Sequence, residues 1–425
     1  MDEAGRLSEI RAAAAALPRD RLLYHIRPAP AGARGDWKGV LTRALRDPIG
    51  TPPLGRMARP GDRVVILADD LTRPTPQRKI LPALLDCLHE AGVADEDVTV
   101  IIALGTHRYM TEAEIRDRFG EAACARVPIV NHTWADADSF VDLGSTPSGT
   151  PVQVNRTAYE ADLLIGTGSI VPHIYAGWGG GAKIVQPGVC SAQTTARTHC
   201  MAADDGDLLG MPGRVENPVR REMEQVAAVA GLDFVLNVVV DASGAPVWAG
   251  AGDFVQAHRA GVRASAQTYV RSIPRPADVA LVDAHPAVAD YWQGIKALAH
   301  ACRGIKRGGT AVLVGEFPDS ISPTHPELAR HTLKPYEAMV KACQVGEVED
   351  AIASATLRLH GLIMDHCRVI CVSPGMGAAD KGKLGFGDAP SVAEALRQAL
   401  DGHDGSATVG IIECGGDVLP QVGQP

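Results

Sequence analysis

The chain has 425 residues, of which 46% are hydrophobic and 21% charged, and it carries a formal net charge of −9 at pH 7. This composition is that of a folded globular protein and excludes a disordered chain. The negative charge argues against broad binding to nucleic acids or anionic membranes, although it leaves room for a local basic pocket.

The chain begins with MDEAGRLSEI, which is acidic and lacks the apolar centre of a signal peptide. No apolar run approaches the ~20 residues needed to span a bilayer. The nine cysteines are scattered, odd in number and form no CxxC pair, which favours free thiols in a reducing compartment. We therefore expect a cytoplasmic protein with no membrane segment.

Short β-branched runs alternate with amphipathic stretches along the chain. The expected strands are 63–68, 98–104, 127–131, 163–166, 234–240, 279–283, 310–315, 369–372 and 408–413. Near-continuous apolar runs of this length are typical of parallel strands that are buried on both faces. Between them, Thr111 with Glu114 and Ser391 with Glu394 fit the capping box at the start of a helix. The alternation predicts an α/β fold with mostly parallel, doubly wound sheets.

The length of the chain and its proline-containing break at 272–277 predict two α/β domains. The Pro/Gly-rich stretch 28–62 is expected to be an exposed loop. A helix at about 253–271 ends at SIPRPA (272–277), which places a boundary there. We expect an N-terminal domain at 1–272 and a C-terminal domain at 278–405. The last segment, 406–425, holds a terminal strand and tail that fit either domain.

Two polar clusters follow expected strands, where ligands bind in α/β sheets. DDLTRP directly follows strand 63–68, and its Arg73 and turn amides could hold an anion, although an ordinary turn with a surface arginine would look the same. GTHR follows strand 98–104. Its His107 could transfer protons near neutral pH or simply be a hydrogen-bonded loop histidine.

The most unusual stretch is PHIYAGWGGGAKIVQPGVCSAQTTARTH, at 172–199. Its clustered glycines, Gly179 and Gly180 among them, indicate that the backbone approaches something closely or takes up positive φ. Lys183 follows them in an apolar setting, where a lysine can lose its charge and become a nucleophile. His173 and His199 bracket it. The stretch therefore predicts a cofactor or substrate site.

Two familiar kinds of site do not fit this stretch. A phosphate-binding P-loop needs GK followed by Ser or Thr, whereas Lys183 lies between Ala182 and Ile184. A zinc site needs ligands at close spacing, and His173 and His199 lack them. One of these histidines could still be the single protein ligand of a metal that is held mainly by a non-protein group.

YWQGIK, at 291–296, is the candidate cluster of the second domain. If this segment is helical, Gln293 and Lys296 face one pocket and suit a carboxylate substrate, although a solvated helix face has the same pattern. The remaining histidines, His325 among them, have no informative neighbours.

These clusters, in this order, resemble the nickel-pincer lactate racemase family over nearly the whole chain. The shared motifs are DLTRP (70–74), GTHR (105–108), PHIYAGWGGGAKIVQPGV (172–189) and WQGIK (292–296). The resemblance implies an active site in the cleft between the domains. It also implies a nickel-pincer nucleotide, pyridinium-3-thioamide-5-thiocarboxylic acid mononucleotide, which is bound covalently to Lys183. His199 would then be the protein ligand of Ni²⁺, and cofactor-assembling enzymes would be partners.

The same resemblance implies that the protein is an isomerase, a racemase or epimerase that inverts C2 of a 2-hydroxy acid. The hydride would pass to and from the cofactor through a 2-keto acid, with His107 and His173 as the catalytic acid–base pair. The residues implied to bind substrate are Arg73, Trp292, Gln293 and Lys296, and those implied to border the cofactor are Asp70, Arg73, Gly179 and Gly180. Trp292 stands where lactate-specific members carry tyrosine, so the reaction class is better indicated than lactate itself.

Two other functions compete with this interpretation. An NAD-type 2-hydroxyacid dehydrogenase would need a GxGxxG turn after an early strand, and the sequence shows none. A non-catalytic metabolite- or metal-binding homologue would have no need for two histidines placed as an acid–base pair.

Overall fold

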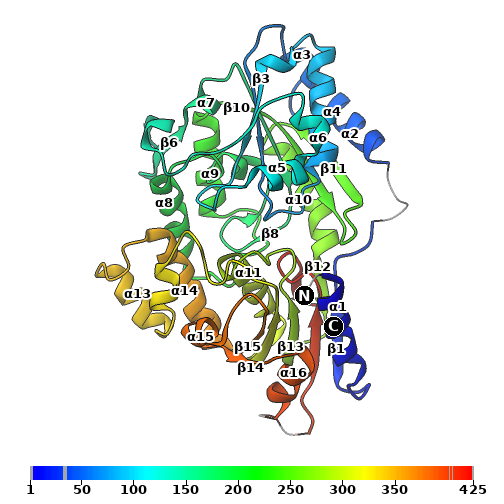
Figure 1. Ribbon diagram of the computed structural model, residues 1–425, viewed down its shortest axis with the longest axis vertical. Coiled ribbons are helices and arrows are strands. Elements are labelled where there is room, and N and C mark those ends of the chain that lie inside the picture. Colours follow the sequence, from blue (N-terminus) through cyan, green and yellow to red (C-terminus); the bar gives the residue numbers. More distant parts are fainter. Residues whose placement is uncertain (1–2, 32–35, 402, 404, 424–425) are drawn as a thin grey trace.

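The computed structural model describes residues 3–31, 36–401, 403 and 405–423 as two α/β lobes, each built on a six-stranded sheet (Figure 1). The first sheet has the order β11-β10-β7-β2-β3-β4. Its strands are β2 (Val64–Ala68), β3 (Val98–Ile102), β4 (Ile129–Asn131), β7 (Leu163–Ser169), β10 (Leu232–Val240) and β11 (Pro246–Gly252). Neighbouring strands are parallel except for β10 and β11.

Helices cover both faces of this sheet, which explains its continuous apolar runs. Ile66 of β2 packs with Leu41 of α2 (Trp37–Arg46) and Ile80 of α4 (Gln77–Glu90). Its neighbour Leu67 points to the opposite face and belongs to the cluster that includes Val226. The helices on that side are α9 (Pro218–Val229) and α10 (Gln256–Tyr269).

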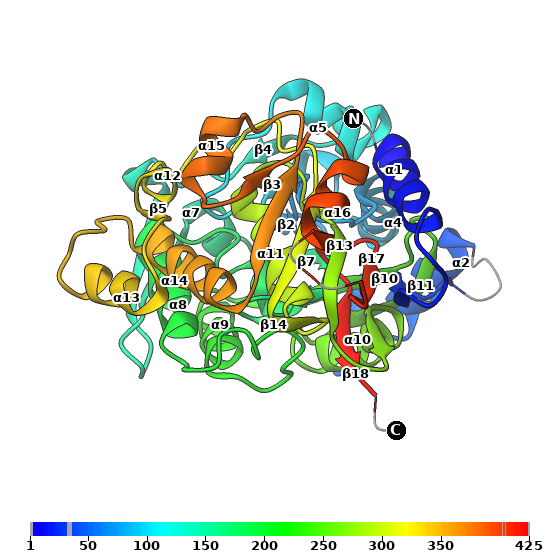
Figure 2. The ribbon, with the colours of Figure 1, turned by 90° about the horizontal axis from the view of Figure 1, so that it is seen from below.

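The second sheet is parallel throughout, with the order β1-β17-β13-β14-β15-β16. Its strands are β1 (Leu22–Ile26), β13 (Ala277–Asp283), β14 (Ile305–Val314), β15 (Arg368–Val372), β16 (Gly387–Asp388) and β17 (Val409–Ile412). α1 (Glu3–Ala15) and α16 (Val392–Leu400) pack on one face. α11 (Tyr291–Ala301) and α14 (Ala351–His366) pack on the other (Figure 2).

The smaller elements connect and cover these layers. The other α-helices of the described residues are α3 (Leu54–Met57), α5 (Glu112–Phe119), α6 (Glu121–Cys124), α7 (Arg156–Tyr159), α8 (Ala192–Ala203), α12 (Glu327–His331), α13 (Tyr336–Gln344) and α15 (Ala378–Lys383). The short strand pairs are β5 (Phe140–Ser145) with β6 (Pro151–Asn155), β8 (Pro172–His173) with β9 (Gly177–Trp178), and β12 (Val270–Ile273) with β18 (Leu419–Val422). Within the described ranges, no helix is long and apolar enough to cross a membrane.

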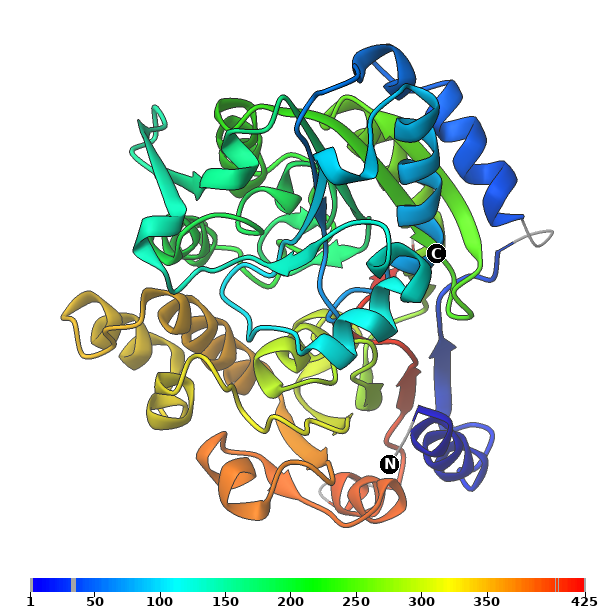
Figure 3. The same cartoon turned by 45° about the horizontal axis from the view of Figure 1, so that its top comes forward.

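Both ends of the described chain join the second lobe, where the dark-blue and red segments lie together (Figure 3). β1 pairs with β17, and β17 pairs with β13. We therefore propose that the second domain contains α1, β1 and β17 in addition to 278–405, so that the first domain begins after β1. The terminal segment is shared, because β18 pairs with β12; its last two residues, 424–425, lie outside the described residues.

The α/β class with mostly parallel sheets is confirmed, and each of the nine expected strands lies in one of the two large sheets. The Thr111–Glu114 capping box is present. At Ser391 only half of the box forms, because the Glu394 carboxylate pairs with Arg397 instead.

The expectation of an exposed loop at 28–62 is wrong. This stretch contains α2 and α3, and Leu41 and Leu54 are buried against the first sheet. Its prolines and glycines misled the prediction because some stand at helix boundaries: Pro53, for example, is the N-cap residue of α3.

Candidate active site

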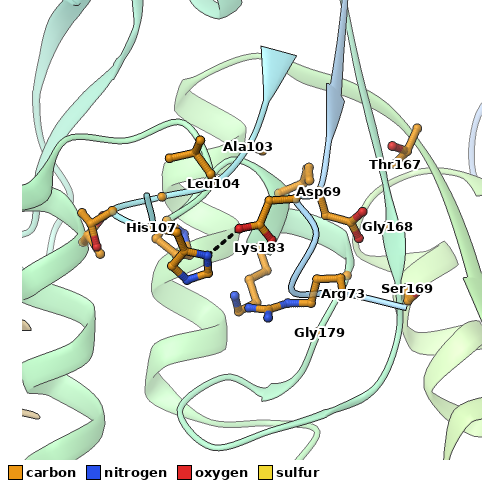
Figure 4. A pocket seen from close by; sticks show the side chains of 18 of the residues that line it. Asp69, Arg73, Ala103, Leu104, His107, Thr167, Gly168, Ser169, Gly179 and Lys183 are labelled. Atoms are coloured by element: carbon orange, nitrogen blue, oxygen red, sulfur yellow. Dashed lines mark hydrogen bonds and ion pairs between the residues drawn. The ribbon is translucent and has the colours of Figure 1, made fainter. Parts of the chain in front are cut away.

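Two adjoining cavities lie between the lobes. Their walls come from the loops after β2 and β3, from the segment after β7, and from α11, which follows β13. Both are open to solvent, and the space between their walls amounts to about 630 and 480 Å³ with that open part included. Residues that line both are Arg73, His107, Lys183, Pro187, His199 and Trp292. In Figure 4 the side chains of Arg73, His107 and Lys183 converge on one space.

Every residue expected at the site lines one or both cavities. Asp70, Gly179 and Gly180 belong to the first cavity, and His173, Gln293 and Lys296 to the second. The carboxyl ends of three strands of the first sheet, together with α8 and the first two turns of α11, therefore bring together residues that are far apart in the sequence.

His107 is held between a carboxylate and an amide. Its Nδ1 lies 2.6 Å from Asp70 Oδ2, which is the dashed line in Figure 4, and its Nε2 lies 3.1 Å from Gln293 Nε2. Because the Gln293 amide donates, Nε2 carries the lone pair and Nδ1 carries the proton. Burial lowers the pKa of His107, and Asp70 offsets part of that shift. His107 thus offers a neutral, basic nitrogen to the cavity.

The Asp70 carboxylate stays ionised beside this ring. Burial alone would raise the pKa of Asp70, but the charge and hydrogen bond of His107 bring it below its ordinary range. Asp70 also accepts hydrogen bonds from the backbone N–H and the hydroxyl of Thr72, at 3.1 and 2.5 Å. A fixed carboxylate in this position can stabilise an imidazolium.

His173 has the opposite arrangement. Its Nδ1 accepts hydrogen bonds from the backbone N–H groups of Tyr175 and Ala176, both at 3.2 Å. In the neutral ring the proton is therefore on Nε2. Burial lowers the pKa of His173 well below its ordinary value, and the nearby charge of Lys183 lowers it further.

Cationic side chains gather at the cavity. Lys296 Nζ donates to Gln293 Oε1 at 2.6 Å, and Arg73 donates to the Thr72 hydroxyl at 2.9 Å. Burial lowers the pKa of Lys296 well below its ordinary value, and Arg73 adds to this effect. A bound carboxylate would reverse that shift by pairing with both cations.

Lys183 lies in the 3₁₀ turn η3 (Gly181–Ile184) and lines both cavities. Burial lowers the pKa of Lys183 well below its ordinary value, and Arg73 and Lys296 lower it further. Among the described residues, none forms a hydrogen bond with its Nζ atom. A lysine whose amine loses its proton more readily and has no hydrogen-bond partner can act as a nucleophile.

The chain around Lys183 is fixed by protein contacts. Gly177 has φ +72°, and a Cβ there would lie 1.9 Å from the Arg214 carbonyl oxygen. Gly180 has φ +73°, and its Cβ would lie 2.7 Å from Ile170. The positive φ and the close approach expected of these glycines are both present, and the close neighbours are protein atoms.

His199, on α8, turns one nitrogen away from the cavity. Its Nδ1 lies 2.9 Å from the Thr195 carbonyl oxygen, which therefore accepts the Nδ1 proton and leaves a lone pair on Nε2. Burial lowers the pKa of His199 to about 4. No cluster of three or more His, Cys, Asp or Glu side chains suited to a metal ion occurs in the described part of the chain. His199 would therefore serve as a single ligand.

Sequence reasoning missed three residues around Trp292. His325 lies 4.2 Å from the indole between ring centroids and pairs with Asp350 at 2.6 Å. Thr356 Oγ1 lies 3.2 Å from both Trp292 Nε1 and Tyr175 Oη. No motif contains His325 or Thr356, and nothing in the 172–189 motif signals the contact of Tyr175 with Thr356, because the partners are far apart in the chain.

Two buried carboxyls near Lys296 were also missed. Burial raises the pKa of both Asp290 and Asp417 to about 7, and Lys296 opposes each rise. Asp290 caps α11 by accepting from the Gln293 backbone N–H at 2.8 Å. Asp417 follows β17, and the strand-end rule that identified the other clusters would have found it.

Comparison with known proteins connects this site to one family. The model of the lactate racemase N-terminal domain matches residues 10–209. The lactate racemase of Thermoanaerobacterium thermosaccharolyticum is 33% identical over 282 residues, and that of Lactiplantibacillus plantarum is 32% identical over 288. Each alignment spans 66% of the chain and 66% of the relative, which is just under two thirds of the relative's length.

Solved structures extend the likeness to nearly the whole chain. The lactate racemase apoprotein from T. thermosaccharolyticum superposes with a TM-score of 0.84 and 28% identity, covering 95% of this chain and 96% of that one. A Thermotoga maritima protein superposes with a TM-score of 0.71 and 19% identity, over 92% of this chain and 100% of its own, and shows the shared fold alone. The chain belongs to the lactate racemase family.

Proposed function

We propose that this protein is an isomerase, a racemase or epimerase that inverts C2 of a 2-hydroxy acid through a 2-keto acid. The observation that carries the proposal is the convergence of two neutral histidines and three cationic side chains on one cavity between the lobes. Family membership supports the reaction class.

In this proposal Arg73 and Lys296 bind the substrate carboxylate, while Gln293 and Trp292 border the substrate. The substrate hydroxyl replaces Gln293 as the partner of His107 Nε2, which takes the hydroxyl proton. Asp70 stabilises the resulting imidazolium through Nδ1. For the opposite enantiomer, His173 takes the place of His107 as the acid–base residue at the substrate hydroxyl, through its Nε2 atom.

We further propose that Lys183 tethers the nickel-pincer nucleotide and that His199 is the protein ligand of nickel, with Gly179 and Gly180 beside the nucleotide. The residues fit the group: the Lys183 amine is unpaired within the described chain, and His199 keeps a lone pair on Nε2. When bound, the cofactor supplies the acceptor and donor for the C2 hydride.

The tether can be tested by mass. The protein would be produced with and without the cofactor-assembling enzymes and compared by intact-mass spectrometry. Co-production is expected to add the mass of the mononucleotide to the wild type and none to Lys183→Ala. Lys79→Ala, which alters a lysine on α4, is the control and should be modified like the wild type. An unmodified wild type, or a modified Lys183→Ala, would contradict the assignment.

The cytoplasmic location expected from the sequence stays a prediction.

A further inference from the structure

Part of the lining of the second cavity is apolar. Beside its cations and histidines, this cavity is lined by Ile174, Val219 and Met223, together with the rings of Tyr175 and Trp292. Val219 and Met223 lie one turn apart on α9 and are almost fully buried, at 0% and 1% exposed. They meet the cavity with aliphatic groups only.

The two aromatic side chains present apolar surface as well. The Tyr175 hydroxyl and the Trp292 indole N–H both contact Thr356 Oγ1, each at 3.2 Å. Thr356 in turn donates to the Ile352 carbonyl oxygen at 3.4 Å. Their polar atoms therefore already have partners, which leaves ring surface for a ligand.

The charges near this cavity suit one carboxylate. Its cationic side chains are Arg73, Lys183 and Lys296, and the proposed tether would make Lys183 neutral. Arg73 and Lys296 would then share a single carboxylate. A second carboxylate beside Val219 and Met223 would be buried without a partner, which is strongly unfavourable.

We propose that the ligand is a monocarboxylic 2-hydroxy acid with an apolar C3 substituent, branched aliphatic or aryl, and that Val219 and Met223 set this preference. The identity of the acid rests on the proposed function, whereas the apolar preference rests on the cavity alone. A methyl group would bury little of the apolar lining formed by Ile174, Val219 and Met223. Each further methylene that becomes buried is expected to raise affinity about fourfold.

Binding to the full chain without cofactor tests this directly when Lys183→Met replaces the untethered lysine, so that the cavity keeps only the cations Arg73 and Lys296. Quenching of tryptophan fluorescence would be titrated with 2-hydroxyisocaproate, 3-phenyllactate, lactate and malate, and Trp292→Phe would identify the signal of this cavity. We expect the two apolar acids to bind at least tenfold more tightly than lactate. Malate is expected to bind most weakly of the four. Malate binding as tightly as 2-hydroxyisocaproate, or no binding of the apolar acids, would overturn the proposal.

Substitution of Met223 sharpens the test. Met223→Lys would supply a cation for a second carboxylate and is expected to reverse the order of malate and 2-hydroxyisocaproate. Met223→Leu is the matched control and should keep the wild-type order. If Met223→Lys loses its folded circular-dichroism spectrum, Met223→Ala takes its place. This variant should raise the affinity for 3-phenyllactate relative to that for 2-hydroxyisocaproate. An unchanged ratio of the two affinities contradicts the proposal.

The loaded enzyme separates this inference from the proposed function. If the predicted binding order holds but none of these acids is racemised, the proposed function fails and the inference stands. If malate is racemised more efficiently than 2-hydroxyisocaproate, racemase activity stands and the inference fails.

Discussion

At the scale of single residues, the two histidines of the cavity differ in the nitrogen that they offer. His107 presents a lone pair on Nε2, because Nδ1 pairs with Asp70. His173 presents an N–H, because two backbone amides occupy its Nδ1. The proposed chemistry therefore begins with one hydrogen-bond acceptor, His107, and one donor, His173. Asp70 raises the basicity of His107.

Asp70→Asn is expected to lower kcat by about 10- to 100-fold, because the imidazolium form of His107 loses a charged hydrogen-bond partner. Activity of the wild type should fall as pH decreases through the pKa of His107, which burial places below its ordinary value. Asp70 raises the pKa of His107, so Asp70→Asn should shift the fall in activity at acidic pH to a lower pH. Asp86→Asn, an exposed carboxylate on α4, is the control. An unchanged limb in the pH profile of Asp70→Asn would refute this role.

How far the sequence predicts the site is also decided residue by residue. Motifs at strand ends were sufficient to predict Arg73, His107 and Lys183, because topology alone brings such ends together. Residues such as His325 and Thr356 could not be predicted, because their contacts with Trp292 depend on how distant helices and loops pack. The roles of all these residues remain proposals.

At the scale of elements, contacts between loops and helices hold the lobes together at the site. Thr106, in the loop after β3, lies 3.3 Å from His325 Nε2, and Arg108 in the same loop pairs with Asp319 at 3.0 Å. His325 also packs on Trp292, the second residue of α11. His325 therefore joins the loop that carries His107 to the helix that carries Gln293 and Lys296.

His325→Ala should loosen this junction. We expect KM to rise about tenfold, the equivalent of one lost hydrogen bond of about 1 to 1.5 kcal/mol, with a smaller change in kcat. Tryptophan emission should shift to longer wavelength as the indole gains water, and this shift should vanish in the Trp292→Phe background. His331→Ala, at the end of α12, is the control. Wild-type KM and emission in His325→Ala would rule out a positioning role.

The strands were the most predictable elements, because helices on both faces force continuous apolar runs. β1, β11 and the two-residue β16 were missed, although all three lie at sheet edges. β1 contains the exposed Leu22 and the polar His25, and β11 contains two glycines, so neither reads as a buried strand. The helices α2 and α3 were hidden by prolines and glycines that lie near their ends.

At the scale of the whole molecule, the N-terminal helix is tied to the lobe formed by the end of the chain. Arg6 of α1 is 1% exposed and pairs with Asp283 at 2.5 Å and with Glu316. Arg11 pairs with Glu413 at 2.9 Å but is 51% exposed. Asp283 and Glu413 lie at the carboxyl ends of β13 and β17, so these ion pairs fix α1 on its face of the second sheet.

Arg6→Ala would leave Asp283 buried without its cation, and we expect a loss of about 3 to 5 kcal/mol in the unfolding free energy of this lobe. Arg11→Ala should cost less than about 1 kcal/mol because its pair is partly solvated. Denaturant titration combined with hydrogen exchange at β13 and β17 would compare the two. If Arg6→Ala unfolds with the same free energy as Arg11→Ala, the buried ion pairs of α1 are not needed to hold the second sheet.

The central claim is that this family member inverts C2 of a 2-hydroxy acid. The most direct test incubates the cofactor-loaded enzyme with each single enantiomer of 2-hydroxyisocaproate, lactate and malate and follows both enantiomers by chiral chromatography. We predict that at least one acid reaches the same racemic mixture from either side, and that His107→Ala and His173→Ala, with cofactor retained, lose this activity. Enantiomers that all stay unchanged with a loaded wild type would contradict the claim.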